Sequence, residues 1–260
     1  MLVHLVADYG QGDLAYAEVR QRLALHLPDA DVVYTPVPPF DSVSAGFVIA
    51  QLALTEGPPD RLVFHNVAPR MDEDSPREDN EGEQLLVAHM PDGAIVVGAA
   101  STYTFSFLKD EAKSLHEVEV PPTGSQFRSR DAFPGLLPAL LAGDDSVLGA
   151  AVSPDTLREP PARRVAYVDG YGNLKTTWSE PPAESGTEVT VRIGAHEARA
   201  VVSDGTFAVP RGQMSFAPGS SGWRRRDGSE VRWLELLARG ASAAEIFGFP
   251  DAGTPVEVSP

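Results

Sequence analysis

The chain has 260 residues, of which 42% are hydrophobic, and its 37 acidic and 21 basic residues give a formal charge of −16. This length favours two domains, and the charge disfavours nucleic acid as a partner because phosphates would be repelled. The lack of cysteine excludes disulfides, thiolate nucleophiles and cysteine-bound metals. We find no apolar stretch of membrane-spanning length and no signal-like start, so we expect a cytoplasmic protein without a membrane partner.

The first half of the chain alternates strand-like and helix-like segments. Apolar and β-branched runs predict strands at residues 2–7, 31–35, 61–65 and 94–97. Helical spacing predicts helices over residues 14–27 and 42–54, the second capped by Asp41 or Ser42, and a buried helix over 131–142. This alternation indicates an α/β N-terminal domain with a mostly parallel sheet. The acidic segment 71–83 has little to bury, so we expect an exposed loop there.

The second half differs in composition. Prolines punctuate residues 152–164, so we place the α/β domain at 1–155 and a second domain at 156–260. Short alternating segments at 188–193, 198–202 and 231–237 are separated by Gly, Pro and Asp turns. This pattern predicts a smaller all-β, barrel-like C-terminal domain.

The first predicted strand ends in Ala7-Asp8-Tyr9-Gly10-Gln11-Gly12. A carboxylate at the carboxyl end of a strand can accept hydrogen bonds from both hydroxyls of a ribose, and glycines let the backbone approach a ligand closely. An aspartate that merely caps the following helix explains the same residues equally well. The same glycine-rich turn also resembles that of Rossmann methyltransferases, which need an acidic residue at the end of the second strand. The chain reads Val32-Val33-Tyr34-Thr35-Pro36 there, so the expected carboxylate is missing.

Two further segments could hold polar ligands. Phe127-Arg128-Ser129-Arg130-Asp131 precedes a predicted helix and suits an anion, although a surface ion-pair cluster is an equal interpretation. Asp169-Gly170-Tyr171-Gly172-Asn173 forms a glycine-flanked turn whose Asp and Asn could bind the ammonium and carboxylate of an amino acid. An ordinary hairpin turn is the alternative there. His65 lies in an apolar run, which favours a structural histidine.

Five segments, taken in order, are similar to motifs of the family of S-adenosylmethionine hydroxide adenosyltransferases, fluorinases and chlorinases. The chain therefore resembles a divergent member of this family. The matching segments are Ala7-Asp8-Tyr9-Gly10, Pro38-Pro39-Phe40-Asp41, Gln126-Phe127-Arg128-Ser129-Arg130-Asp131, the stretch 168–177, and Gly219-Ser220-Ser221-Gly222-Trp223 with the stretch 233–242. The resemblance implies a seven-stranded α/β N-domain and a β-barrel C-domain. It also implies a homotrimer in which the adenosyl site is shared between the N-domain of one subunit and the C-domain of its neighbour.

The resemblance also implies a substrate and the residues that hold it, with no cofactor and no metal. The substrate is S-adenosylmethionine, which is attacked at the ribose C5′ atom. The implied contacts are Asp8 for the ribose hydroxyls, Phe40 for the sugar, Phe127 and Tyr171 for the adenine ring, Asp169, Asn173 and Ser220 for the methionine portion, and backbone groups around Gly240 for the adenine edge.

The sequence departs from the family where water is positioned. Hydroxide-using members carry an Asp and a His there, whereas this chain has Ala68, or Asn66 in a shifted alignment, and Arg128. Neither an amide nor a guanidinium can act as a general base. Our leading hypothesis is hydrolysis of S-adenosylmethionine to adenosine and methionine, with Arg70, Arg128 and Ser129 placing the nucleophile. The alternative is a non-catalytic or repurposed protein that binds adenosine-like ligands.

Overall fold

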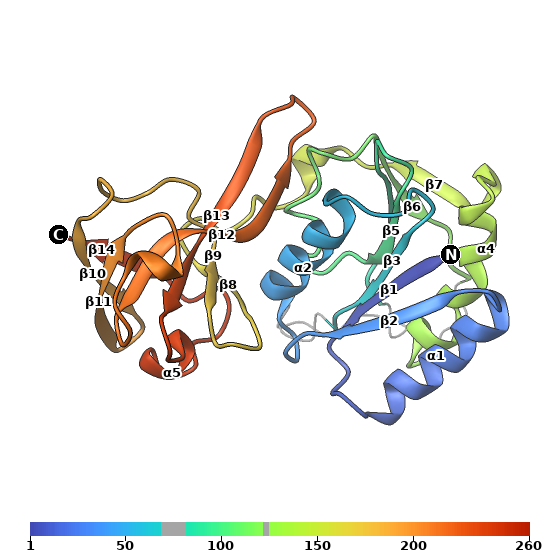
Figure 1. Cartoon of the computed structure of the whole chain (residues 1–260). Coiled ribbons are helices and arrows are strands. Elements are labelled where there is room, and N and C mark those ends of the chain that lie inside the picture. Colours follow the sequence, from blue (N-terminus) through green and yellow to red (C-terminus); the bar gives the residue numbers. More distant parts are fainter. Residues whose placement is uncertain (69–81, 122–124) are drawn as a thin grey trace. The chain divides into compact units, whose positions relative to one another are not determined.

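The computed structural model describes residues 1–68, 82–121 and 125–260 (Figure 1). The chain divides into two compact units, Met1–Glu159 and Pro160–Pro260, so the division falls four residues after the boundary expected from composition. Within the described ranges, every helix is too short or too polar to cross a lipid bilayer.

The first unit is built on a seven-stranded sheet with the order β2-β1-β3-β5-β4-β6-β7. Its strands are β1 (Leu2–Ala7), β2 (Asp31–Pro36), β3 (Leu62–Asn66), β4 (Leu85–His89), β5 (Ile95–Ala99), β6 (Ser114–Val118) and β7 (Leu148–Ala151). Its helices are α1 (Leu14–His26), α2 (Ser42–Leu54), α3 (Arg128–Asp131) and α4 (Phe133–Leu141), with short 3₁₀ turns at Asp145–Val147 and Pro154–Thr156.

This sheet is mixed, so the expectation of a mostly parallel sheet is wrong. Pairs β1–β2, β1–β3 and β3–β5 are parallel, but β4–β5, β4–β6 and β6–β7 are antiparallel. Only five residues connect β4 to β5, and a parallel pair needs a crossover of about a dozen or more. Strands β4, β6 and β7 are missing from the sequence-based expectation.

Helices cover both faces of the sheet. Val19 and Leu23 of α1 pack with Leu137 of α4 against Leu5 and Phe64 in one core cluster. Helix α2 contacts β1, β3 and β5 but shares none of that cluster, so it covers the opposite face (Figure 1). Nine of the thirteen α2 residues are buried, which explains why this helix is apolar all round.

The helix expected over 131–142 is two helices. Helix α3 ends at Asp131 and α4 begins at Phe133, with Ala132 between them. Pro134 lies in the first turn of α4, where its missing N–H would have no partner inside the helix anyway. Proline therefore favours a new helix start here over continuation of α3.

The second unit has a sheet with the order β14-β10-β11-β12-β13-β9-β8. The strands are β8 (Val165–Val168), β9 (Leu174–Thr176), β10 (Glu188–Ile193), β11 (His196–Val202), β12 (Met214–Arg224), β13 (Glu230–Ala238) and β14 (Val256–Ser259), with helix α5 (Ala243–Ile246) and a 3₁₀ turn at Thr206–Ala208. Pair β11–β12 is parallel and the other pairs are antiparallel.

The expected fold class is therefore wrong as a whole. The chain is not a parallel-rich α/β domain followed by a smaller barrel: its described residues form two mixed sheets of seven strands each, the second curled as a half-barrel, with few helices. A bridge between Arg164 and Pro255 joins the segments beside β8 and β14. Short strands with turns between them predict β structure, but they do not specify which strands pair.

His65 of β3 is fully buried, and its ring lies 5.0 Å from the ring of Phe105 and close over Gly98. Neither ring nitrogen has a hydrogen-bond partner among the described residues. Burial lowers the pKa of His65 to about 3, so the ring is neutral in the folded protein.

This histidine should make the protein sensitive to acid. The pKa of His65 is 6.5 in the unfolded chain and lower in the folded protein. As the pH falls below 6.5, the unfolded chain binds a proton that the folded protein does not, so the free energy of unfolding decreases. Between pH 7 and pH 5 we expect a loss of about 2 kcal/mol in the free energy of unfolding from His65. Urea unfolding at both pH values measures it, and His65→Leu should remove this component. An equal loss in both proteins would contradict the assignment.

Candidate functional site

In the sheet of the first unit, the strands that follow β1 along the chain are added on opposite sides of β1. From β1 the chain passes through α1 to β2 on one side, whereas β3 lies on the other side and is followed by β4 and β5. In open sheets, ligands bind beside the carboxyl ends of the strands at such a switch point. The β1–β3 register pairs Ala7 with Asn66, so Asp8 and the residues after Asn66 meet at this edge.

The Asp8 carboxylate is anchored through one oxygen. Its Oδ2 atom accepts hydrogen bonds from the backbone N–H groups of Phe40 and Ala68, each at 3.1 Å. Its Oδ1 atom has no hydrogen bond within the described part of the chain, and the residue is half-buried. The helix-capping alternative for Asp8 is wrong, because Asp13 caps α1 by accepting from the N–H of Ala15 at 2.7 Å.

Phe40 lies beside this carboxylate in a strained backbone conformation. Its φ is 62°, which bulky residues rarely adopt, and its side chain is 39% exposed. The next residue, Asp41, caps α2 by accepting from the N–H and the hydroxyl of Ser44 at 2.8 and 2.6 Å. Asp8 and the α2 cap therefore hold the Phe40 turn from both ends, and strain held in this way is typical of functional sites.

Tyr9 connects the strand end to the segment around Ser129. Its hydroxyl is 2.7 Å from the hydroxyl of Ser129, which is buried, and its ring meets the Phe127 ring edge-on at 5.8 Å. The Arg130 guanidinium lies 4.9 Å from the centre of the Phe127 ring. The structure thus brings Ser129 and Phe127 into contact with Tyr9, the residue that follows Asp8. Tyr9 carries this link, a role that its place in the sequence does not indicate.

The phenol groups at this edge stay protonated at neutral pH. The pKa of Tyr34 is raised to about 12, mainly because the phenol is partly buried and secondly because the Asp8 carboxylate lies nearby. Burial is also the main cause of the raised pKa of Tyr9. Tyr34 donates to the backbone oxygen of Tyr9 at 2.5 Å, so it fixes the backbone directly after Asp8.

Of the two arginines expected to place the nucleophile, Arg128 lies within the described part of the chain. Arg128 donates to the backbone oxygen of Glu83 at 3.4 Å, and its guanidinium lies 5.5 Å from the centre of the Phe133 ring. None of its hydrogen bonds within the described residues reaches Asp8. Arg70 lies outside the described residues.

In the second unit, Asp169 and Asn173 close the turn between β8 and β9. One Asp169 oxygen accepts from the N–H groups of Tyr171 and Asn173 at 2.9 and 3.0 Å, and the other accepts from the Asn173 side-chain amide at 2.9 Å. The side chain of Tyr171 is 85% exposed. The turn thus brings Asp169 and Asn173 together and leaves the aromatic ring at the surface.

The remaining candidates of this unit lie on β12 and after β13. Ser220 is exposed, whereas its neighbour Ser221 is buried and donates from its hydroxyl to Glu235 at 3.1 Å. Gly240 is exposed in the turn that follows β13, where its φ of 78° favours glycine.

Sequence reasoning missed two charged residues of this unit, Lys175 and Glu235. Lys175 lies 2.8 Å from Glu235 and 3.9 Å from the second oxygen of Asp169. A usable signal was present, since Glu235 interrupts an apolar strand, Trp233-Leu234-Glu235-Leu236-Leu237. Charged residues are rarely buried unless they are paired.

Comparisons with known proteins extend the fold assignment. No protein-family model matches the chain, and no curated protein matches it. An uncharacterized conserved protein from Thermotoga maritima matches 99% of this chain with all of its own length, at a TM-score of 0.75 and 18% identity. A conserved hypothetical protein from Thermus thermophilus matches 99% of both chains at a TM-score of 0.66 and 25% identity. The likeness covers both units, and neither protein's description states a function.

Proposed function

We propose that this protein binds S-adenosylmethionine and transfers its adenosyl group from sulfur to water, which gives adenosine and methionine. The observation that carries the proposal is the anchored Asp8 carboxylate at the switch point of the first sheet. Two backbone N–H groups hold its Oδ2 atom, and among the described residues none donates to Oδ1, so this oxygen can accept from a ligand. A ribose offers two neighbouring hydroxyl donors of the kind such a carboxylate accepts.

The proposed reaction is an in-line displacement at C5′. The water oxygen forms a bond to C5′ while the C5′–S bond breaks, and the electron pair of that bond goes to sulfur. Methionine leaves as a neutral thioether, and the water proton passes to solvent. The task of the protein is alignment and removal of surrounding water, which needs hydrogen-bond donors and acceptors more than a strong base. We assign this positioning to Ser129, Arg70 and Arg128.

The other contacts of the proposed ligand rest on the family resemblance. In this assignment Phe40 packs on the sugar, and Phe127, Tyr171 and the backbone at Gly240 contact the adenine. Asp169, Asn173 and Ser220 serve the methionine portion. The assembly would be a homotrimer, and the reaction needs no cofactor.

A second candidate function is binding of adenosine-like ligands without turnover. It is favoured by the residues at the water-positioning places. Ala68 contributes only its backbone N–H, which Asp8 already occupies, and Arg128 is engaged by the carbonyl of Glu83. Neither group can take a proton from water.

Incubation of the purified protein with S-adenosylmethionine separates these functions. Chromatography should detect adenosine and methionine in equal amounts, and their rate of appearance should scale with protein concentration. Adenosine binding by calorimetry without any product would favour the binding protein instead. S-adenosylhomocysteine as the product would indicate a methyltransferase, and absence of both binding and product would reject the adenosyl site.

A further inference from the structure

A buried ion pair joins the two motifs of the second unit that the proposed function assigns to methionine. Lys175 of β9 and Glu235 of β13 lie 2.8 Å apart, with side chains 11% and 2% exposed. On one side, the Lys175 ammonium lies 3.9 Å from Asp169, whose carboxylate organises the Asn173 turn. On the other side, Glu235 accepts from the hydroxyl and the N–H of Ser221 at 3.1 and 3.3 Å. One network therefore reaches from the turn to β12.

Glu235 also shapes the irregular part of β12. The β12–β13 register shifts between Pro218 and Gly222, which pair with Leu234 and Arg232, so residues 219–221 face a single residue of β13. A Cβ atom at Gly219 would lie 2.0 Å from the carboxyl carbon of Glu235, so only glycine lets the carboxylate fit against this bulge. Bulges of this kind re-aim side chains next to functional sites.

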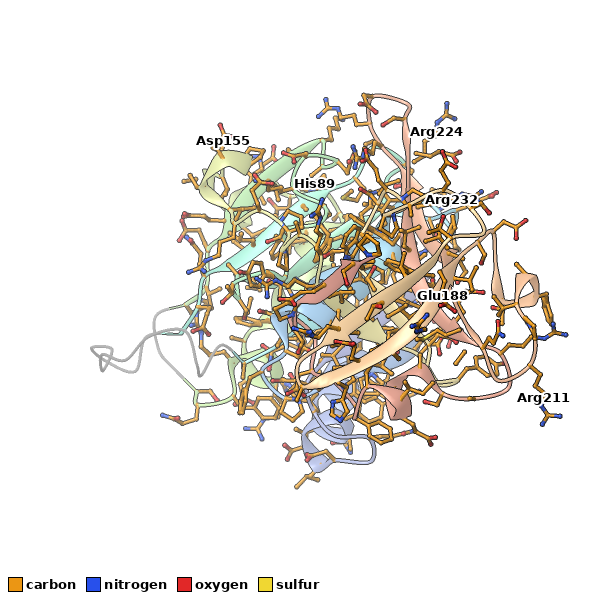
Figure 2. All side chains as sticks on the ribbon, turned by 90° about the vertical axis from the view of Figure 1, so that its left-hand side faces the viewer. His89, Asp155, Glu188, Arg211, Arg224 and Arg232 are labelled. Carbon is orange, nitrogen blue, oxygen red and sulfur yellow. The ribbon has the colours of Figure 1, made fainter. Side chains whose placement is uncertain are left out.

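The bulge borders a hollow on the β12–β13 hairpin. Its volume is about 290 Å³, and its lining includes Ser220, Ser221, Arg224 and Arg232. Figure 2 shows Arg224 and Arg232 on this hairpin. Ser220 is thus exposed at the hollow, while Ser221 beside it is tied to Glu235. Glu235 thus holds the residue next to Ser220.

We propose that Lys175 and Glu235 are positioning residues for the amino-acid end of the substrate, which rests on the proposed function. Lys175 keeps the carboxylates of Asp169 and Glu235 together, because it places a cation between two like charges that would otherwise repel. Loss of the Lys175 charge would displace the Asp169–Asn173 turn and the Ser220–Ser221 bulge together. The larger effect should fall on the methionine portion, since Asp169, Asn173 and Ser220 are assigned to it, whereas Asp8, which is assigned to the ribose, belongs to the first unit.

The test compares ligand affinities in the full chain by calorimetry, using adenosine and S-adenosylmethionine. The variants are Lys175→Met, Lys175→Arg, and the double variant of Lys175→Met with Glu235→Leu. The double variant removes both charges, so it should fold even if Lys175→Met alone does not. We expect Lys175→Met and the double variant to raise the Kd for S-adenosylmethionine by at least about tenfold, because misplaced positioning groups cost on this scale. Adenosine affinity should fall by less, because adenosine lacks the methionine portion although Tyr171, which is assigned to adenine, lies in the displaced turn. Lys175→Arg keeps the charge and should lose less affinity than Lys175→Met.

Arg192→Met is the matched control, since it breaks an ion pair with Glu197 that is more than half exposed on both sides. It should leave both affinities unchanged. Wild-type affinity for S-adenosylmethionine in a folded Lys175→Met or double variant would overturn the positioning role. So would an equal loss for adenosine, which indicates general damage. A wild-type protein that binds neither ligand would overturn the proposed function, and this inference with it.

Discussion

Asp8→Ala is expected to weaken adenosine binding by about 100-fold or more, as measured by isothermal titration calorimetry. A carboxylate that accepts from two ribose hydroxyls makes hydrogen bonds worth about 1.5–3 kcal/mol each, so losing both removes about 3 kcal/mol or more. The substitution also releases the N–H groups of Phe40 and Ala68, which Asp8 now holds. Both effects act in the same direction, because the loops that line the switch point lose their anchor.

A ligand change and a matched variant make the Asp8 experiment specific. The wild-type protein should prefer adenosine to 2′-deoxyadenosine, and Asp8→Ala should bind both with equal affinity. Asp13→Ala lies in the same segment and removes the α1 cap, which costs about 1 kcal/mol of stability. It should leave adenosine affinity unchanged. A hydroxyl preference that survives in Asp8→Ala would show that another group binds the ribose.

Lys175→Met is expected to lower the free energy of unfolding by about 3–5 kcal/mol, because it leaves the Glu235 carboxylate buried without its cation. Glu235 is 2% exposed, so solvent cannot replace the lost partner. The hydroxyl and N–H of Ser221 remain as donors, but neither carries a charge. Urea denaturation of the full chain measures the change.

The double variant with Glu235→Leu should recover most of this stability, because apolar residues of similar volume often replace a buried ion pair without loss. Arg192→Met should leave the unfolding midpoint unchanged, since exposed pairs contribute little. If Lys175→Met and the double variant are equally destabilised, the cost lies in packing around Lys175 and not in the unpaired charge. In the expected outcome, stability and ligand affinity separate, because the double variant recovers its stability but does not regain S-adenosylmethionine binding.

Local patterns in the sequence were sufficient for part of this protein. The predicted helices over 14–27 and 42–54 are confirmed as α1 and α2, because helical spacing and the Asp41 cap are properties of neighbouring residues. The end of β1 at Ala7 is also confirmed, which places Asp8 at a strand end. The ribose role of Asp8 stays a prediction from this placement and from the resemblance.

Strand partners and side-chain pairs were decided only by the tertiary structure. Local apolar runs identify buried segments, but whether β4 pairs antiparallel with β5 and β6 depends on connections and packing across the whole sheet. The contacts that shape the candidate sites also join residues far apart in the sequence. Tyr9 and Ser129 are separated by 120 positions, and Lys175 and Glu235 by 60. The sequence alone therefore determined where the first strand ends and that Asp41 or Ser42 caps the second helix. Folding determined which of them meet, because such contacts depend on the path of the entire chain and not on the spacing of neighbours.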